Sequence, residues 1–144
     1  MNDRNKATPA CYLILKRDDK VLLLRRQGSG YFDGWYSLPA GHIEEGEIPT
    51  ECTIRETKEE IGVEVRKEDL TLVHTMYRTK HDPTGDRADY FFTTHLWSGE
   101  PVIGEPEKCD DLAWFPITSL PENTIPHIRD VIVGIEKGIT YSEL

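Results

Sequence analysis

Residues 41–63, GHIEEGEIPTECTIRETKEEIGV, carry the pattern from which the rest of the chain can be interpreted. Two glycines, a lone glutamate, an Arg-Glu pair and a Glu-Glu pair stand at fixed distances in it: Gly41-x5-Glu47-x7-Arg55-Glu56-x-x-Glu59-Glu60-x-Gly62. If residues 50–61 form a helix, Glu56, Glu59 and Glu60 stand at i, i+3 and i+4 and share one stripe. A cation among them would offset their repulsion, and hard divalent ions such as Mg²⁺ take oxygen ligands of this kind.

Helix signals bracket this acidic stripe. Thr50 is suited to the N-cap, and Gly62 can adopt the left-handed conformation that ends a helix. Ile54 and Ile61 stand at i and i+7, with Cys52 and the Thr57 methyl as weaker partners, so one side of the helix can pack on a sheet. We therefore expect a helix that is buried on one side and charged on the other.

A salt-bridged helix that simply faces water is the alternative interpretation, since most Glu-rich helices do so. Arg55 reaches Glu59 at i+4 and would hold that carboxylate in either case. The seven fixed positions of the pattern favour a metal site, because average residue usage makes such a coincidence rare.

The segment matches the Nudix box, G-x5-E-x7-R-E-U-x-E-E-x-G-U, in which U is apolar. Every charged and glycine position fits; Thr57 departs from the first apolar position, and Val63 fits the second. Residues 35–39, WYSLP, resemble the strand and proline that lead into the box. The pattern of the elements alone predicts an α/β or α+β sandwich, and the resemblance narrows it to the Nudix fold, a mixed β-sheet between helices.

The resemblance implies a Mg²⁺-dependent hydrolase that cleaves a diphosphate linkage in a nucleoside diphosphate joined to a further group. Mn²⁺ is an alternative metal. The implied metal ligands are Glu56, Glu59, Glu60 and the carbonyl of Ala40. The implied catalytic residues are Arg55, Glu56, Glu59, Glu60 and Glu105.

Three further positions resemble segments of MutT-type members of that family. In WSGEPVIGE, residues 97–105, the second glutamate is Glu105. The resemblance implies that Glu105 is an auxiliary metal ligand or the general base, and the alternative is that it is one of many acidic loop residues. In LPENTIP, residues 120–126, Asn123 corresponds to an asparagine that reads a purine base; the alternative is a helix N-cap. Arg26 corresponds to an arginine that contacts substrate.

Three functions follow, in decreasing order of support. The first is a nucleoside triphosphate pyrophosphohydrolase, which releases a nucleoside monophosphate and pyrophosphate and uses Asn123 to read the base. The second is a pyrophosphatase for ADP-ribose, a nucleotide sugar or a dinucleotide. The third is a nucleotide-sensing domain without activity, which the intact charged residues of the box disfavour.

Composition predicts one domain over residues 1–144. Seventeen Lys and Arg against 26 Asp and Glu leave a net charge of −9, which argues against polymeric nucleic acid as a partner. The resemblance implies a small nucleotide substrate, which an acidic protein can bind through a metal. Three cysteines without a CxxC pair favour a reducing compartment. With a polar N-terminus and apolar runs of strand length only, we expect a cytoplasmic protein without a membrane segment, as a monomer or homodimer.

Alternation of apolar residues predicts strands on both sides of the box. A hairpin turning at residues 17–20 joins the first two strands, and residues 27–34 form a loop in which Tyr31 or Phe32 could stack on a base. A turn is expected at residues 83–86. The predicted strands are 8–16, 21–26, 63–65, 71–79, 88–97 and 112–116, and a second helix is predicted at 123–137.

Overall fold

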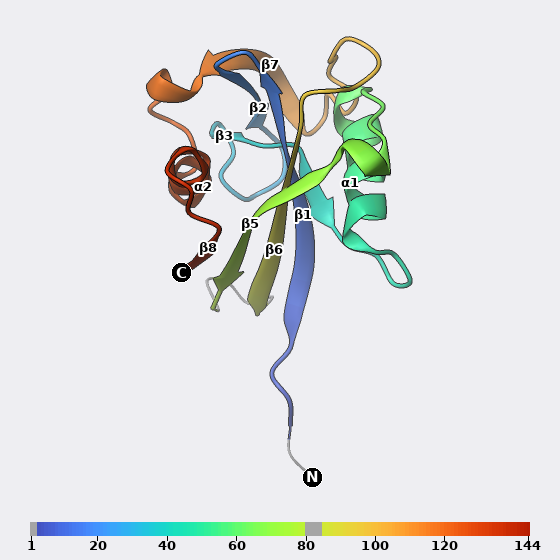
Figure 1. The fold of residues 1–144 in the computed structure, drawn as a ribbon, viewed down its shortest axis with the longest axis vertical. Helices are drawn as coiled ribbons and strands as arrows, with labels where there is room; N and C mark the ends of the chain where they lie inside the picture. Colours follow the sequence, from blue (N-terminus) through green and yellow to red (C-terminus); the bar gives the residue numbers. More distant parts are fainter. Residues whose placement is uncertain (1–2, 80–84) are drawn as a thin grey trace.

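The computed structural model describes residues 3–79 and 85–144 (Figure 1). A mixed β-sheet lies between two helices, α1 (Pro49–Ile61) and α2 (Pro126–Glu136). The strands are β1 (Ala7–Arg17), β2 (Lys20–Arg26), β3 (Tyr36–Ser37), β4 (Ala40–His42), β5 (Thr71–Arg78), β6 (Asp86–Thr94), β7 (Cys109–Pro116) and β8 (Tyr141–Glu143). Short 3-10 helices cover Lys67–Asp69 and Ile117–Ser119.

Strand β1 is the centre of the sheet. It pairs in parallel with β6 over its first nine residues, antiparallel with β4 near its start and antiparallel with β2 at its end. The order along the sheet is β3-β2-β1-β6-β5-β8, with β4 also on β1 and β7 also on β2. A strand covered on both faces must be apolar almost throughout, which explains why the middle of β1 reads Cys-Tyr-Leu-Ile-Leu.

Alternation along the strands divides the core into two layers. Leu13 and Leu15 pack with Ile61 of α1, whereas Ile14 between them packs with Ile128 and Ile132 of α2. Successive side chains of a strand point to opposite faces, so one apolar run can supply both layers. The helices cover the two faces accordingly, as Figure 1 shows.

Most sequence-predicted elements are confirmed, but residues 63–65 and the starts of both helices need correction. Residues 63–65 form no strand; within the described chain Glu64 makes a single bridge to Ser98. The second helix begins at Pro126 with Ile125 as its N-cap, so the N-cap alternative for Asn123 is wrong. Proline fits the first helical turn, where its missing N–H costs nothing. Of the turn predicted at 83–86, residues 83 and 84 lie outside the described part of the chain.

Helix α1 also starts differently from the prediction. Its N-cap is Ile48 rather than Thr50, because Pro49 takes the first helical position and the Glu51 carboxylate accepts the Ile48 N–H at 3.0 Å. Its buried residues are Cys52, Thr53, Thr57 and Ile61, whereas Ile54 is only partly buried. Gly62 ends the helix as predicted, with φ of 70°.

Neither helix in the described residues is long and apolar enough to cross a membrane.

Candidate active site

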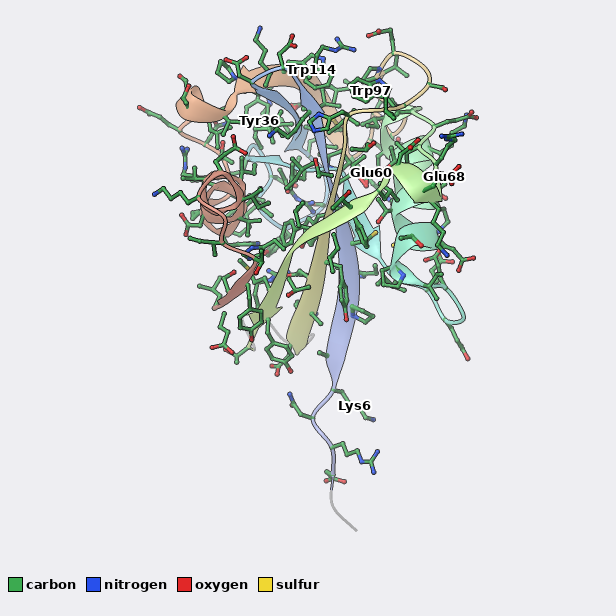
Figure 2. The ribbon with its side chains drawn as sticks, viewed as in Figure 1. Lys6, Tyr36, Glu60, Glu68, Trp97 and Trp114 are labelled. Atoms are coloured by element: carbon green, nitrogen blue, oxygen red, sulfur yellow. The ribbon has the colours of Figure 1, made fainter. Side chains whose placement is uncertain are left out.

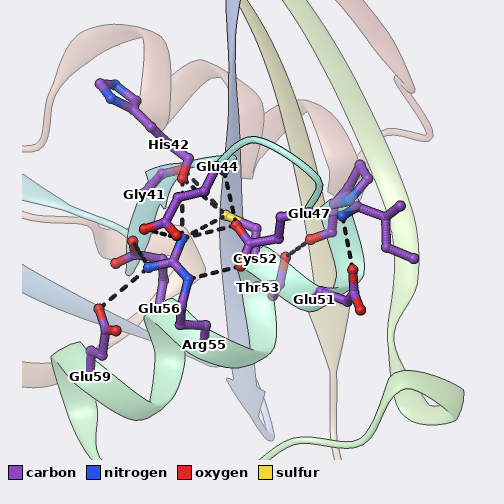
Figure 3. A network of polar contacts seen from close by, with 12 residues as sticks. Gly41, His42, Glu44, Glu47, Glu51, Cys52, Thr53, Arg55, Glu56 and Glu59 are labelled. Atoms are coloured by element: carbon purple, nitrogen blue, oxygen red, sulfur yellow. Dashed lines mark hydrogen bonds and ion pairs between the residues drawn. The ribbon is translucent and has the colours of Figure 1, made fainter.

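Arg55 is the centre of the polar network on α1 (Figure 3). Its Nε and Nη2 donate to the two carboxylate oxygens of Glu47, at 2.8 and 3.0 Å, and Nη1 donates to Glu56 at 2.7 Å. Nη2 also donates to the His42 carbonyl at 3.2 Å. The paired geometry of guanidinium and carboxylate makes this clamp rigid. The sequence-predicted contact of Arg55 with Glu59 is present, but at 3.5 Å it is the longest of these carboxylate contacts.

Gly41 is required because the Glu56 side chain lies directly over it. A Cβ at position 41 would stand 2.1 Å from Glu56 Cδ. Gly41 pairs with Cys11 on β1, so its backbone cannot move aside without breaking that pairing. The first glycine of the box therefore leaves space for the first carboxylate of the acidic stripe.

Glu60 lies between α1 and the sheet, as Figure 2 shows. Its Oε1 accepts the Ala40 N–H at 3.0 Å, which connects the helix to β4. Burial raises the pKa of Glu60 well above its ordinary value, and the nearby Glu56 and Glu105 carboxylates add to the shift. Burial likewise raises the pKa of Glu56, against the effect of Arg55.

Loop 99–108 brings Glu105 to these carboxylates. The Val102 N–H donates to the Ile61 carbonyl and the Gly104 N–H to the Glu60 carbonyl, each at 2.9 Å. These carbonyls belong to the last turn of α1, which has no partners inside the helix for them. The loop thus caps the helix and places Glu105, one residue on, beside the acidic stripe. Lys108 lies 3.7 Å from the Glu105 carboxylate.

A pocket of about 620 Å³ opens over these groups. One part of it is acidic, with Glu56, Glu60 and Glu105 in its wall. The lining also has basic and aromatic side chains, those of Tyr12, Arg26, Tyr31, His42, Arg78 and Arg87, and Lys108 lies beside Glu105. Such a volume suits a nucleotide-sized ligand.

The structure gathers most of the sequence-predicted site residues at this pocket, although it leaves three outside its lining. Ala40, Arg26, Glu56, Glu60 and Glu105 line the pocket. Among the described residues, the lining does not include Arg55, which reaches the pocket only through Glu56, nor Glu59, whose side chain is 48% exposed, nor Asn123. The Asn123 amide donates instead to the Gly34 carbonyl at 2.9 Å and so fixes the end of loop 27–34.

The donor set at the acidic end fits a hard divalent cation. Within the described residues, no three His, Cys, Asp or Glu side chains already stand together as a complete metal cage. Mg²⁺ does not require one, because it is commonly held by one or two carboxylates together with waters and substrate phosphates. Glu56 and Glu60 supply the two carboxylates, and Glu105 and Ala40 supply further oxygens in the same wall.

Sequence reasoning missed the buried Arg78–Asp89 pair in the floor of the pocket. Arg78 Nε donates to Asp89 Oδ2 at 2.7 Å, and the side chains are 7% and 0% exposed. Burial raises the pKa of Asp89, while the hydrogen bonds from Arg78 and Tyr12 oppose that shift. The available signal was a charged residue at an inward-facing position on each of two adjacent predicted strands.

Gly41→Ala is expected to reduce activity about 100-fold while the fold is kept, because the new methyl group displaces Glu56 and not the backbone. Turnover and urea unfolding measure the two effects separately. A Glu56→Ala background tests the cause: with that side chain removed, Gly41→Ala should cost no further stability. An equal loss of stability in both backgrounds would contradict the explanation.

The contribution of Glu47 to the free energy of unfolding is expected to be lost in acid. The hydrogen bonds from Arg55 lower the pKa of Glu47 to about 2, from an ordinary value of 4.5. A lowered pKa means stabilisation that is complete above pH 4.5 and is lost as the pH falls toward 2. The wild type should therefore lose its advantage over Glu47→Gln, about 1 kcal/mol, across that window. Urea unfolding at pH 7, 4 and 3 measures it, with Glu45→Gln, an exposed neighbour, as the control.

Fold and site together define a class: an α+β domain in which an Arg-clamped acidic helix forms one wall of a nucleotide-sized pocket. The family model of the NUDIX domain matches residues 5–133. The chain belongs to the NUDIX family, which confirms the resemblance of its 41–63 segment.

Relatives of known name extend across most of the chain. It is 31% identical over 114 residues to an ADP-ribose pyrophosphatase of Methanocaldococcus jannaschii, covering 79% of this chain and 64% of that protein. It is 30% identical over 138 residues to the NAD-capped RNA hydrolase NudC of Pseudomonas aeruginosa, covering 92% of this chain and 46% of that protein. The chain thus spans less than two thirds of the length of these curated relatives.

Solved structures show the same fold. A MutT NUDIX hydrolase from Burkholderia pseudomallei superposes with a TM-score of 0.81 at 24% identity, covering 90% of this chain and 98% of that one. A MutT protein from Methanosarcina mazei superposes with a TM-score of 0.77 at 16% identity, covering 94% and 97%.

Proposed function

We propose that this chain is a divalent-metal-dependent hydrolase that cleaves the diphosphate linkage of a nucleoside diphosphate joined to a further group. The observation that carries the proposal is the convergence of Glu56, Glu60 and Glu105 in one wall of a pocket that continues into a basic, aromatic part. Like charges gathered in a partly buried wall favour a bound cation, because it removes their repulsion and the cost of burying them.

The protein groups have distinct roles in this proposal. Arg55 holds Glu56 through Nη1 and is itself fixed by Glu47, so the carboxylate keeps its position over Gly41. The Ala40 N–H fixes Glu60. Glu105 is an auxiliary ligand or the general base that takes the proton from water, and Glu59, exposed on the same helix as Glu56 and Glu60, is a further candidate for either role. Arg26 donates to a substrate phosphate.

Mg²⁺, or Mn²⁺ in its place, would be held by Glu56 and Glu60 and would neutralise phosphate charge and acidify a water. The reaction adds water to phosphorus and breaks one P–O bond of the anhydride. Positioning and neutralisation of charge supply most of the rate enhancement in phosphoryl transfer.

The substrate is proposed to be a small nucleotide. Hydrolysis of ADP-ribose or a dinucleotide is supported by the relatives named ADP-ribose pyrophosphatase and NAD-capped RNA hydrolase. The nucleoside triphosphate function, the first expectation from the sequence, depends on Asn123 as the reader of the base, but the Asn123 amide is bound to the Gly34 carbonyl and lies outside the pocket lining of the described chain. That function thereby loses its structural support, and we propose a nucleoside diphosphate derivative as the substrate.

Product analysis tests this proposal. The purified protein is incubated with ADP-ribose, NAD⁺, ATP and a 5′-NAD-capped oligoribonucleotide, with Mg²⁺ or with chelator, and products are identified by chromatography. We expect Mg²⁺-dependent release of AMP and ribose 5-phosphate from ADP-ribose at a higher kcat/KM than release of AMP from ATP, which carries the same base. If no nucleotide is cleaved under any condition, the proposal is wrong, and a preference for ATP would restore the triphosphate function.

A further inference from the structure

The part of the pocket away from Glu56 and Glu60 is built on one face of the sheet. Ala10 of β1 pairs with Asp89 of β6, which pairs with Met76 of β5. Paired residues share a face, and so do residues two apart on one strand, so Tyr12, Asp89 and Arg78 lie together. We call these three residues the polar floor. The same face carries the core beneath α2, and Tyr12 stacks on Phe91 of that core with ring centroids 4.5 Å apart.

The polar floor is held rigidly. Arg78 binds Asp89 through Nε at 2.7 Å and through Nη2 at 3.3 Å. The Asp89 side chain is fully buried behind Arg78, and Tyr12 adds a further hydrogen bond to it. A buried ion pair that keeps both partners is fixed in place, because separating the charges there is costly.

In the polar floor the donor groups of Arg78 line the pocket, whereas the acceptor oxygens of Asp89 do not. A guanidinium has five N–H donors. Two of those of Arg78 go to Asp89, and longer contacts of 3.4 Å join it to the hydroxyls of Tyr12 and Tyr31. One Nη1 N–H therefore has no partner among the described residues, at a side chain that lines the pocket. The Asp89 carboxylate lies outside the lining.

The surroundings favour a neutral ring over a second phosphate. Asp89 cancels the charge of Arg78, so an additional anion would gain little from this pair. Tyr12 is held flat against Phe91, and Tyr31 also lines the pocket, with the Arg26 guanidinium over its ring at 5.4 Å. Aromatic walls of this kind pack against flat ligands.

We propose that Arg78 is a specificity-determining contact that donates to an acceptor on the nucleobase of the substrate, and that Asp89 and Tyr12 are positioning residues that aim it. The inference rests on the proposed function, whose metal end would orient the diphosphate. A base with a carbonyl at that edge fits the donor, whereas an amino group would face donor to donor. The proposal places the C6 substituent of a purine at that edge, and so it means preference for a 6-oxo over a 6-amino ring.

The test uses substrate pairs that differ only at C6 of the purine: NAD⁺ with its deamino analogue, and ATP with ITP. We expect the wild type to prefer the 6-oxo member by about 10-fold in kcat/KM, the discrimination of one good base contact. Arg78→Met/Asp89→Asn should lower that preference to about 1, mainly through KM of the 6-oxo member. Because both substrates are measured on the same preparation, partial unfolding of the variant cancels in the ratio.

Tyr12→Phe and Tyr77→Phe form a matched pair. Each removes one hydroxyl that bonds an aspartate, but Tyr77 lies on the other face of β5, where its hydroxyl donates to Asp86. Tyr12→Phe should reduce the 6-oxo preference about threefold, an effect of one lost contact in the floor. Tyr77→Phe should leave the preference unchanged.

Binding of IMP and AMP by isothermal titration, without metal, is a second readout that does not depend on hydrolysis. A wild-type ratio near 1 in all pairs, or a preference that survives Arg78→Met/Asp89→Asn, would overturn the inference while hydrolysis itself upholds the proposed function. Loss of hydrolysis with IMP still bound more tightly than AMP would instead overturn the proposed function and uphold the role of Arg78. The inference would also be overturned if inorganic phosphate bound more tightly than IMP and the double variant lost that binding. The polar floor would then be an anion site.

Discussion

Glu60→Gln is expected to reduce Mg²⁺-dependent hydrolysis on the order of a thousandfold, since a charged metal ligand contributes several kcal/mol to lowering the barrier. The fold should persist, because the amide oxygen of glutamine can still accept the Ala40 N–H that Glu60 Oε1 accepts at 3.0 Å. Removing a partly buried carboxylate beside Glu56 and Glu105 also relieves repulsion. Turnover at saturating Mg²⁺ and the midpoint of thermal unfolding measure the two effects.

Glu64→Gln is the matched control for this substitution. Glu64 follows the end of α1, is exposed and pairs only with Lys58 among the described side chains. Exposed pairs contribute little, so activity should stay within about twofold of wild type. Normal turnover in Glu60→Gln, or an equal loss in both variants, would refute the metal role of Glu60.

Gly104→Ala is expected to destabilise the protein by about 3 kcal/mol and to lower activity with it. A Cβ at position 104 would stand 2.2 Å from the Glu59 carbonyl oxygen. That oxygen belongs to the backbone of α1, so loop 99–108 must retreat and lose its hydrogen bonds to the Glu60 and Ile61 carbonyls. The last turn of the helix would then lose its cap, and Glu105 would leave the acidic wall. Urea unfolding and kcat measure the change.

Gly134→Ala is the corresponding control in α2. There a Cβ would stand 3.6 Å from Ile139, an ordinary contact distance. Alanine is the better helix former by about 1 kcal/mol, so this variant should be as stable as wild type or more so. If both substitutions destabilised the protein equally, close approach of the loop to α1 would not be the cause.

Local features of α1 could be predicted because they depend on residues close in sequence. Glu56, Glu59 and Glu60 share a stripe because of the helical period, and Gly62 ends the helix because its left-handed φ costs nothing in glycine. The predicted start of the helix was wrong. Thr50 was expected as the N-cap, but Pro49 occupies the first helical position, so Ile48 is the N-cap.

Asn123 shows where a resemblance in sequence was insufficient. Its segment, followed by Pro126, suits both a base reader and a helix cap, since an asparagine amide serves either. The pairing of Thr124 with Tyr36 of β3 and the contact with Gly34 hold Asn123 against loop 27–34 instead. Both partners are distant in sequence, and no local preference encodes that choice.

The sequence by itself determined the family, the sandwich class of the fold and the acidic helix, because hydrophobic period, capping and the spacing of charged residues act over a few positions. Only the tertiary structure decided which groups complete the pocket. Loop 99–108 reaches α1, and Arg78 meets Asp89, through the register of β5 and β6 and the closure of a loop. Such contacts depend on burial and strand pairing summed over the whole sheet, and no short stretch of residues specifies them.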